Sequence, residues 1–257
     1  MKIIKFIQQF QTERNLLKGS VGFVPTMGAL HSGHLSLIQQ SLAENDNTVV
    51  SIFVNPTQFD NNNDLNNYPN LIESDVQQLQ SLGVDCVLLP DFEQMYPDDY
   101  HYKVLENELS KKFCGAHRNG HFDGVLTIVM KLFNIVQPTK AYFGEKDFQQ
   151  LTLIKQMVSA FFMPIEIIAG QTVRELDGLA MSSRNLNLSA EERMIAPKLY
   201  QTISSGKTLK QMTAILESYG FTVDYLEILN DRLLVAAYLG DVRLIDNVVI
   251  DKLEKVA

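Results

Sequence analysis

The sequence predicts a doubly wound α/β domain built on a parallel sheet, followed by a smaller α+β domain. Over the first two thirds of the chain, short β-branched runs alternate with longer segments of helical periodicity. This alternation is typical of a parallel sheet that carries helices on both faces. After about Thr172 the order changes to helical segments followed by strand-like runs, which favours a separate domain. We therefore expect a first domain at residues 1–172 and a second at residues 173–257.

The elements of the first domain follow from these periodicities. Short apolar runs predict five strands, at residues 21–25, 48–54, 85–89, 140–143 and 165–169. The intervening segments predict four helices, at residues 33–43, 71–82, 122–136 and 148–160. In the third of these helices Phe122, Val125 and Val129 recur at helical spacing, so we expect this stripe to face a core.

The second domain begins with a helix-start signal. Ser189 followed three residues later by Glu192 is a capping box, and it predicts a helix that runs to about Ser204. A further helix is expected at residues 209–219, and strands at residues 223–229 and 242–250. In the first domain, the asparagine-rich residues 60–67 have turn chemistry and little apolar surface, so they predict a mobile loop.

Composition excludes several classes of protein. The 257 residues include 22 Lys and Arg and 30 Asp and Glu, which gives a formal net charge of −8. An acidic chain is a poor general binder of nucleic acid or of anionic membranes. No segment approaches the ~20 apolar residues that cross a bilayer, and the N-terminal residues turn polar too early for a secretory signal. We expect a cytoplasmic protein with neither nucleic-acid nor membrane partners.

The densest chemical signal lies at residues 24–35, where the first long strand should end and a helix should begin. Ligands of α/β proteins bind at this carboxyl edge of the sheet. Gly28 and Gly33 have the spacing of a Walker A loop, but His34 and Leu35 occupy the positions that this motif gives to Lys and Ser or Thr. A P-loop is therefore excluded.

The remaining motif is His31-Ser32-Gly33-His34 at a helix N-terminus. Gly33 lets a ligand approach the backbone, and the amide N–H groups and helix dipole attract phosphate. The two imidazoles can donate hydrogen bonds to phosphoryl oxygens. The alternative interpretation is that both histidines only satisfy the strand–helix junction.

A second motif, Gly144-Glu145-Lys146-Asp147, also joins a predicted strand to a helix. It should therefore emerge at the same edge of the sheet. Lys146 suits a phosphate, and Asp147 suits a metal or a ribose. Gln150, just beyond, offers a neutral amide. A solvated surface turn is the alternative.

Two more segments complete the set of candidate sites. Ser182, Ser183 and Arg184 form a polar cluster at the domain junction, and hydroxyls with a guanidinium make a plausible phosphate clamp. Asn55 and Gln58 follow a buried strand, so they should lie at the sheet edge, where Gln58 can bind a substrate hydroxyl or carboxylate. The alternatives are a helix-capping loop for the first segment and ordinary Asn-Pro turn chemistry for the second.

Zinc is a competing hypothesis for one further segment. Cys114, His117 and His121 have a spacing within the range of zinc ligands. We do not favour a zinc site, because Arg118 lies between the potential ligands and no second compact cluster accompanies them. Two distant cysteines, Cys86 and Cys114, also make no disulfide framework.

Taken in order, the four candidate segments resemble the pantothenate synthetase (pantoate–β-alanine ligase) family of the HxGH nucleotidylyltransferase superfamily. Similar stretches at residues 118–125, 172–175, 224–227 and 243–247 extend the resemblance over nearly the whole chain. One departure is Asn119, where the family usually has proline, and we expect it to loosen the loop before His121.

The resemblance implies a Rossmann-like first domain and an ATP-dependent acyl activation in two steps. Pantoate would attack the α-phosphate of ATP to give pantoyl adenylate and pyrophosphate. The amine of β-alanine would then displace AMP to give pantothenate. It also implies Mg²⁺ with the ATP phosphates, for which Asp147 is a candidate ligand, and a homodimer formed through the first domains.

The resemblance also assigns roles residue by residue. His31, His34, Lys146 and Arg184 would be catalytic, and Gln58 and Gln150 would hold pantoate. The expected nucleotide site comprises Met27, Gly28, Ala29, Leu30, His31, Ser32, Gly33, His34, Gly144, Glu145, Lys146, Asp147, Val173, Met181, Ser182, Ser183 and Arg184.

Two other functions compete with this one. Another HxGH transferase would move a nucleotidyl group onto a phosphorylated acceptor, but such an acceptor calls for a basic pocket, whereas Gln58 and Gln150 are neutral. A nucleotide-binding regulatory module would keep the fold without turnover. The joint presence of His34, Lys146 and Arg184 argues against that loss of catalysis.

Overall fold

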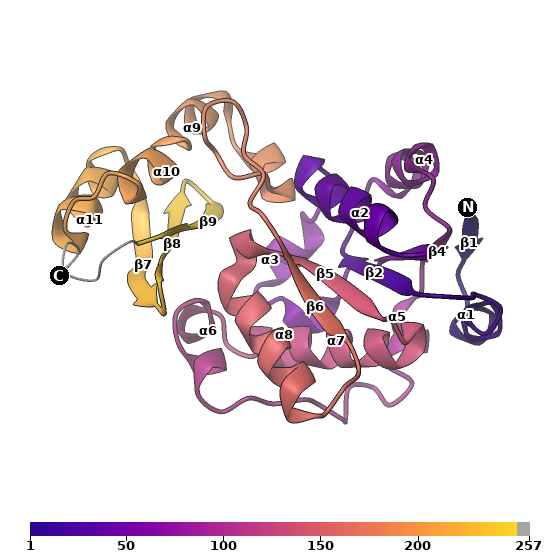
Figure 1. Cartoon of the computed structure of the whole chain (residues 1–257). Helices are drawn as coiled ribbons and strands as arrows, with labels where there is room; N and C mark the ends of the chain where they lie inside the picture. Colours follow the sequence, from indigo (N-terminus) through magenta and orange to yellow (C-terminus); the bar gives the residue numbers. More distant parts are fainter. Residues whose placement is uncertain (251–257) are drawn as a thin grey trace. The chain divides into compact units, whose positions relative to one another are not determined.

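The computed structural model describes residues 1–250, and the chain divides into two compact units (Figure 1). The first unit consists of Met1–Glu145 and Gln150–Gly170. The second contains the residues from Gln171 onward together with the short segment Lys146–Gln149. By its contacts, therefore, part of the Gly-Glu-Lys-Asp turn belongs to the second unit, although it lies well before residue 172 in the sequence.

A six-stranded parallel sheet forms the centre of the first unit. Its strands are β1 (Lys2–Ile4), β2 (Val21–Thr26), β3 (Asn47–Ile52), β4 (Cys86–Leu88), β5 (Lys140–Gly144) and β6 (Glu166–Gly170). They lie in the order β1-β4-β3-β2-β5-β6, and every neighbouring pair is parallel. The predicted doubly wound α/β fold is confirmed, and all five predicted strands form. The edge strand β1 was not predicted.

The strand order reverses at β2, which lies between β3 and β5. Such a reversal leaves a crevice outside the carboxyl ends of the two strands, and α/β proteins bind ligands there. β2 pairs with β3 along its whole length but with β5 only at Gly22 and Phe23. Pro25, which has no N–H for a ladder, lies just beyond this second pairing. The histidine motif and the Gly-Glu-Lys-Asp turn follow these two strands.

Helices cover both faces of this sheet, as Figure 1 shows: α2 and α4 lie on one face, and α7 and α8 lie on the other. The helices that begin in this part of the chain are α1 (Ile7–Arg14), α2 (Ser32–Glu44), α3 (Asn62–Asn66), α4 (Ile72–Leu82), α5 (Phe92–Met95), α6 (Cys114–His117), α7 (His121–Val136) and α8 (Phe148–Ala160). Short 3₁₀ turns lie at Pro56–Gln58, Leu109–Lys111 and Glu145–Asp147. The predicted stripe of Phe122, Val125 and Val129 is buried.

The prediction of a loop at residues 60–67 was wrong, because the short helix α3 forms within it. Tertiary charge pairing accounts for the difference. Arg118 Nε donates to Asp60 at 3.1 Å, and its Nη2 lies 4.0 Å from Asp64. Asp64 also stands in the first turn of α3, where a negative charge favours the helix dipole.

The second unit has an antiparallel sheet and its own core. Its strands are β7 (Thr222–Leu229), β8 (Arg232–Leu239) and β9 (Val242–Val249), and its helices are α9 (Ala190–Ile195), α10 (Lys198–Ile203) and α11 (Leu209–Ser218). A 3₁₀ turn at Ser183–Asn187 precedes them. Leu199, Met212, Leu216, Leu233 and Val235 are buried in one cluster. Amphipathic helices thus pack on one face of the sheet.

Two predictions for this unit need correction. The single helix expected from Ser189 to Ser204 is broken into α9 and α10, because Pro197 lacks the N–H that would continue the ladder. The capping box itself forms: Ser189 Oγ accepts the Glu192 N–H, and the Glu192 carboxylate accepts the Ser189 N–H. The central strand β8 was missed, and the turn before it places Asn230 in the left-handed region.

Candidate functional site

Between β2 and α2 the chain makes a turn in which two successive residues are left-handed. Thr26 starts it, because its hydroxyl donates to Ser51 O and accepts the Gly28 N–H. Gly28 has φ of 83° and Ala29 has φ of 51°. A Cβ on Gly28 would lie 3.0 Å from Asp75 Oδ2, so both its backbone conformation and its surroundings require glycine.

A buried carboxylate holds this turn in place. Asp75 of α4 is 1% exposed, and its two oxygens accept the backbone N–H groups of Ala29 and Leu30, each at 2.8 Å. Because these contacts stabilise the conformation just before the histidine motif, Asp75 supports the site without being part of the motif. Sequence reasoning did not identify Asp75.

The two motif histidines cap the start of α2 reciprocally. His31 Nδ1 accepts the Gly33 N–H at 3.1 Å, and His34 Nδ1 accepts the His31 N–H at 3.4 Å. Their ring centroids are 4.1 Å apart. Because each Nδ1 accepts a hydrogen bond, a neutral ring carries its hydrogen on Nε2. Each imidazole is therefore a hydrogen-bond donor through Nε2, at a helix N-terminus that already favours anions.

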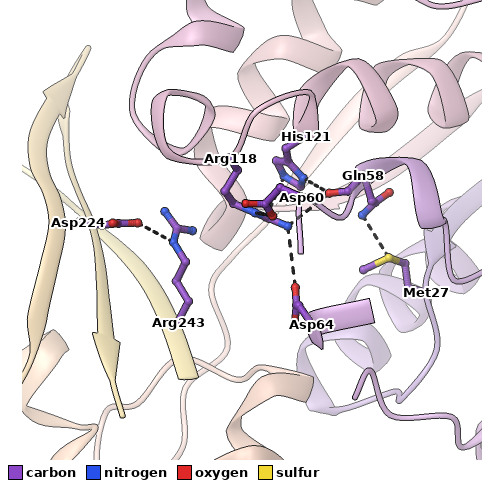
Figure 2. Close-up of polar contacts among 8 residues, drawn as sticks. All are labelled: Met27, Gln58, Asp60, Asp64, Arg118, His121, Asp224 and Arg243. Carbon is purple, nitrogen blue, oxygen red and sulfur yellow. Dashed lines mark hydrogen bonds and ion pairs between the residues drawn. The ribbon is translucent and has the colours of Figure 1, made fainter. Parts of the chain in front are cut away.

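Gln58 lies at the end of a 3₁₀ turn after β3, and its side chain joins two candidate segments (Figure 2). Its Nε2 donates to Met27 Sδ at 3.1 Å, and its Oε1 accepts from Asn55 Nδ2 at 3.1 Å. Met27 belongs to the turn before the histidine motif. The structure thus brings a predicted nucleotide-site residue and a predicted pantoate-site residue into contact.

The backbone of Gln58 is held as well, by the loop before α7 (Figure 2). The Gln58 carbonyl lies 2.7 Å from His121 Nδ1 and accepts from Arg118 Nη2 at 3.3 Å. Since a carbonyl only accepts, His121 Nδ1 must donate to it. Arg118 Nη1 can only donate, and it lies 3.2 Å from His121 Nε2, so Nε2 is the acceptor of this second contact. Arg118, Asp60 and His121 therefore fix the backbone from which the Gln58 side chain extends.

These contacts argue against the zinc hypothesis. His121 Nδ1 donates to the Gln58 carbonyl, and His121 Nε2 faces the Arg118 guanidinium. Neither nitrogen is well placed to bind zinc, because a neighbouring cation repels a metal ion. Within residues 1–250, His, Cys, Asp and Glu side chains nowhere gather in a group of three or more that could hold a metal. Cys86 and Cys114 are both free thiols.

In the second unit, Asn247 of β9 holds the Gly-Glu-Lys-Asp turn. Asn247 Nδ2 donates to the Lys146 carbonyl at 3.0 Å, and Asn247 Oδ1 accepts from Arg232 at 2.7 Å. The Arg232 guanidinium also lies 4.7 Å from the centre of the Phe148 ring. Asn247 is 3% exposed, so these hydrogen bonds lie in the interior of the unit. The sequence alone gave no sign of this contact.

The serine–arginine segment follows a tight hairpin in the second unit. The Met181 N–H donates to Val173 O at 3.0 Å, which places two predicted nucleotide-site residues side by side. Ser182 Oγ accepts the Arg184 N–H at 3.3 Å and starts a 3₁₀ turn in which Ser183 is buried. The three polar side chains therefore follow one another on a defined turn.

An ion pair braces the base of that hairpin. Arg174 donates to both oxygens of the buried Asp246, at 2.6 and 2.9 Å, and this bidentate geometry is the strong form of such a pair. Elsewhere in the sheet Arg243 Nε donates to Asp224 at 2.8 Å (Figure 2). Two ion pairs of this unit thus join residues of the stretches at 172–175, 224–227 and 243–247.

Comparison with known proteins covers nearly the whole chain and agrees with the family resemblance of the four candidate segments. The family model described as pantoate-beta-alanine ligase matches residues 2–249. The pantothenate synthetase of Bdellovibrio bacteriovorus is 55% identical over 96% of this chain and 98% of its own, and that of Thermosipho africanus is 45% identical over 97% and 100%.

Solved structures are equally similar. A crystal structure of pantoate-beta-alanine ligase from Francisella tularensis, complexed with beta-gamma ATP and beta-alanine, has a TM-score of 0.93 and 45% identity, with 97% of both chains covered. Pantothenate synthetase from Thermus thermophilus has a TM-score of 0.87 and 39% identity, covering 96% of this chain and 99% of its own.

Proposed function

This chain belongs to the pantoate–β-alanine ligase family, and on that premise we propose that it joins pantoate to β-alanine through a pantoyl-adenylate intermediate. The ATP-dependent ligation itself follows from the family. The single observation that carries it is the match of the family model over residues 2–249. The Francisella tularensis relative, complexed with beta-gamma ATP and beta-alanine, supports the same two substrates for this chain.

The adenylate route has two steps, and each forms one bond and breaks another. A pantoate carboxylate oxygen forms a bond to the α-phosphorus of ATP while the bond to the bridging oxygen of pyrophosphate breaks. The amine of β-alanine then attacks the acyl carbon. The bond from this carbon to the oxygen that joins it to phosphorus breaks, AMP leaves with that oxygen, and the nitrogen loses a proton. A carboxylate is a poor acyl donor, and esterification to AMP supplies the leaving group. The protein has to position the reactants and balance charge.

On the first unit, the proposed ATP contacts begin with the histidines. Their Nε2–H groups and the amide groups at the start of α2 would donate to phosphoryl oxygens as charge develops on them. Gly28 and Ala29 would allow the ligand close to the backbone of the turn. Met27, Leu30, Ser32, Gly33, Gly144 and Glu145 complete the proposed lining of this unit.

On the second unit, Lys146, Ser182, Ser183 and Arg184 are proposed to contact the phosphates. Val173, Met181 and Asp147 are proposed to line the nucleotide. The contact of Asn247 with the Lys146 carbonyl and the 3₁₀ turn begun by Ser182 support this assignment, because both hold the backbone from which these side chains extend.

Gln58 and Gln150 are proposed to bind pantoate. Both are partly buried neutral amides, which suit the hydroxyl groups and carboxylate of a small acid. The fixed backbone and side chain of Gln58 support its role, because a substrate group binds more tightly to a donor that is already oriented.

Mg²⁺ is proposed to accompany ATP. Mg²⁺ commonly binds through one or two carboxylates together with substrate phosphates, and in that position it neutralises charge on them. Among the described residues no group of three or more His, Cys, Asp or Glu side chains could hold a metal, so the proposed ion would be bound mainly through the ATP phosphates. Asp147, on the turn beside Lys146, is the candidate carboxylate.

The decisive assay supplies ATP, pantoate and β-alanine and identifies the nucleotide products. AMP and pyrophosphate are expected, whereas ADP and phosphate would indicate an acyl-phosphate route and contradict the proposal. Exchange of labelled pyrophosphate into ATP should require pantoate and not β-alanine, since the first step alone releases pyrophosphate.

Two properties implied by the family resemblance are also proposed. The first is a homodimer formed through the first units, which sedimentation at several concentrations would test. The second is a cytoplasmic location, which cell fractionation would test. Among the helices of residues 1–250, none combines the length and the apolar character needed to cross a bilayer.

A further inference from the structure

A buried tyrosine lies behind the proposed pantoate site. Tyr96, which follows α5, is 2% exposed, and its hydroxyl donates to Asn55 Oδ1 at 2.8 Å. Asn55 is itself 1% exposed, and its side chain contacts Gln58. A continuous path of hydrogen bonds therefore runs from Tyr96 through Asn55 to the residue proposed to hold pantoate.

The orientation of the Asn55 amide is fixed by a group that can only accept. Asn55 Nδ2 lies 3.3 Å from the backbone carbonyl of Gly124, so the nitrogen and not the oxygen must face α7. The opposite end, Oδ1, accepts from the Tyr96 hydroxyl and from Thr57 Oγ1 at 3.0 Å. Gly124 permits this approach, because a Cβ there would lie 2.3 Å from Thr57 O.

The Asn55 amide in turn fixes Gln58. Since Asn55 Nδ2 donates to it, the nearer atom of the Gln58 amide must be the acceptor Oε1. Nε2 then points the other way, where it contacts Met27 Sδ at 3.1 Å. A thioether is a weak acceptor, so an oxygen of a bound substrate would be a better partner for this N–H.

We propose that Tyr96 is a positioning residue that strengthens the amide orientation set by the Gly124 carbonyl, so that Gln58 presents its N–H₂ group to an oxygen of pantoate. This inference rests on the proposed role of Gln58 in pantoate binding. Without the tyrosine hydroxyl, Asn55 Oδ1 loses one of its two donors. The Asn55 and Gln58 amides are then less strongly held in the orientation that donates to substrate.

The surroundings of Tyr96 suit a fixed donor. Its ring packs 4.9 Å from Phe92, and Lys131 Nζ lies 4.7 Å from the ring centre while donating to Met95 O. Burial raises the pKa of the Tyr96 phenol to about 12, so the hydroxyl keeps its hydrogen throughout the working range of an enzyme. The ring is therefore held independently of its hydroxyl, and Tyr96→Phe should remove only the contacts of that hydroxyl, with Asn55 Oδ1 and with Thr57 Oγ1 at 3.1 Å.

The test measures KM for pantoate and for ATP in the full chain. Tyr96→Phe should raise the pantoate KM by about 3- to 10-fold, the range for one lost hydrogen bond, and should leave the ATP KM within about twofold. Tyr142→Phe is the matched control. Tyr142 is also a buried tyrosine, but its hydroxyl donates to Glu44 at 3.0 Å, away from Gln58. It should change neither KM.

A double-mutant cycle with Gln58→Ala distinguishes positioning from general damage. If Tyr96 acts through Gln58, then Tyr96→Phe should have no further effect on the pantoate KM once Gln58 is alanine. An equal effect in both backgrounds would overturn the proposal, as would an unchanged pantoate KM in Tyr96→Phe alone. If Tyr96→Phe does not fold, Thr57→Val removes the other donor to Asn55 Oδ1 and tests the same path.

The cycle also separates this inference from the function on which it rests. If Gln58→Ala leaves the pantoate KM unchanged, the assignment of Gln58 to pantoate is wrong and the inference fails with it. If Gln58→Ala raises that KM and Tyr96→Phe does not, Gln58 binds pantoate but does not depend on Tyr96. Only a rise in both single variants, without additivity in the double variant, supports the proposal.

Discussion

The carboxylate of Asp75 accepts the backbone N–H of Ala29 at 2.8 Å, at a residue whose φ of 51° is unusual for anything but glycine. A left-handed alanine carries a conformational cost, and a buried acceptor that also takes the next N–H offsets it. The turn that precedes the histidine motif thus depends on a residue from another helix.

We expect Asp75→Asn to destabilise the protein by about 1–3 kcal/mol, because an amide can accept one of the two N–H groups but turns its own N–H₂ toward the other. It should also raise the ATP KM, since the histidine motif follows this turn. Chemical unfolding and steady-state kinetics measure the two effects. Glu73→Gln, an exposed change in the same turn of α4, is the control and should have neither effect.

His34→Ala should lower kcat by on the order of 10²–10³-fold, because it removes a donor to charge that develops in the transition state. The thermal unfolding temperature should change little, since His34 is only partly buried. His101→Ala, at an exposed histidine outside the motif, should keep wild-type kcat. Near wild-type turnover in His34→Ala would show that the catalytic role belongs to another residue.

Arg184→Ala should reduce kcat strongly and leave pantoate affinity nearly unchanged. The reason is that the proposed contact is to phosphate, while pantoate is assigned to Gln58 and Gln150. Titration calorimetry with pantoate and pyrophosphate exchange measure the two quantities. Arg184→Lys keeps the charge but not the forked donor, so an intermediate rate is expected. A parallel loss of pantoate binding would contradict the assignment.

One ion pair predicts a defined dependence of stability on pH. The hydrogen bond from Lys131 holds the pKa of the Asp98 carboxyl at about 2, below its ordinary value of 3.8. A carboxyl with a lowered folded pKa stabilises the protein above the ordinary value, and the benefit is lost as the pH falls. Wild type and Asp98→Asn should therefore differ by a constant amount above about pH 5 and converge between pH 4 and 2. Melting temperatures across this range test it.

The fold was predictable where local periodicity reflects the final packing. The five predicted strands and the helices between them alternate regularly, and most of them bury one continuous stripe or run of side chains. β1 was missed because only one of its three residues is buried, whereas β4, which is equally short, is buried throughout. The break between α9 and α10 depends on Pro197. This is a local signal, but the prediction followed the capping box at Ser189 and extended one helix through the proline.

The site was predictable only where its residues are close in sequence. The histidine box and the 3₁₀ turn begun by Ser182 are local, and both appear as motifs. In contrast, Asp75 holds the turn before the histidine box from 46 positions away, Tyr96 holds Asn55 from 41 positions away, and Asn247 holds Lys146 from 101 positions away. Contacts over such separations depend on the order of the strands, which the hydrophobic pattern does not specify.

The place of β2 in the sheet also governs how the protein folds. Gly22 pairs with Thr48 on one side and with Lys140 on the other, so one edge of β2 is completed early in synthesis and the other waits for most of the sheet to emerge. Closing so long a loop is entropically costly and slow, and until then an apolar strand edge is open to wrong partners. Among the strands that finally pair on both sides, β2, which leads into the histidine motif, thus keeps an open edge longest during synthesis.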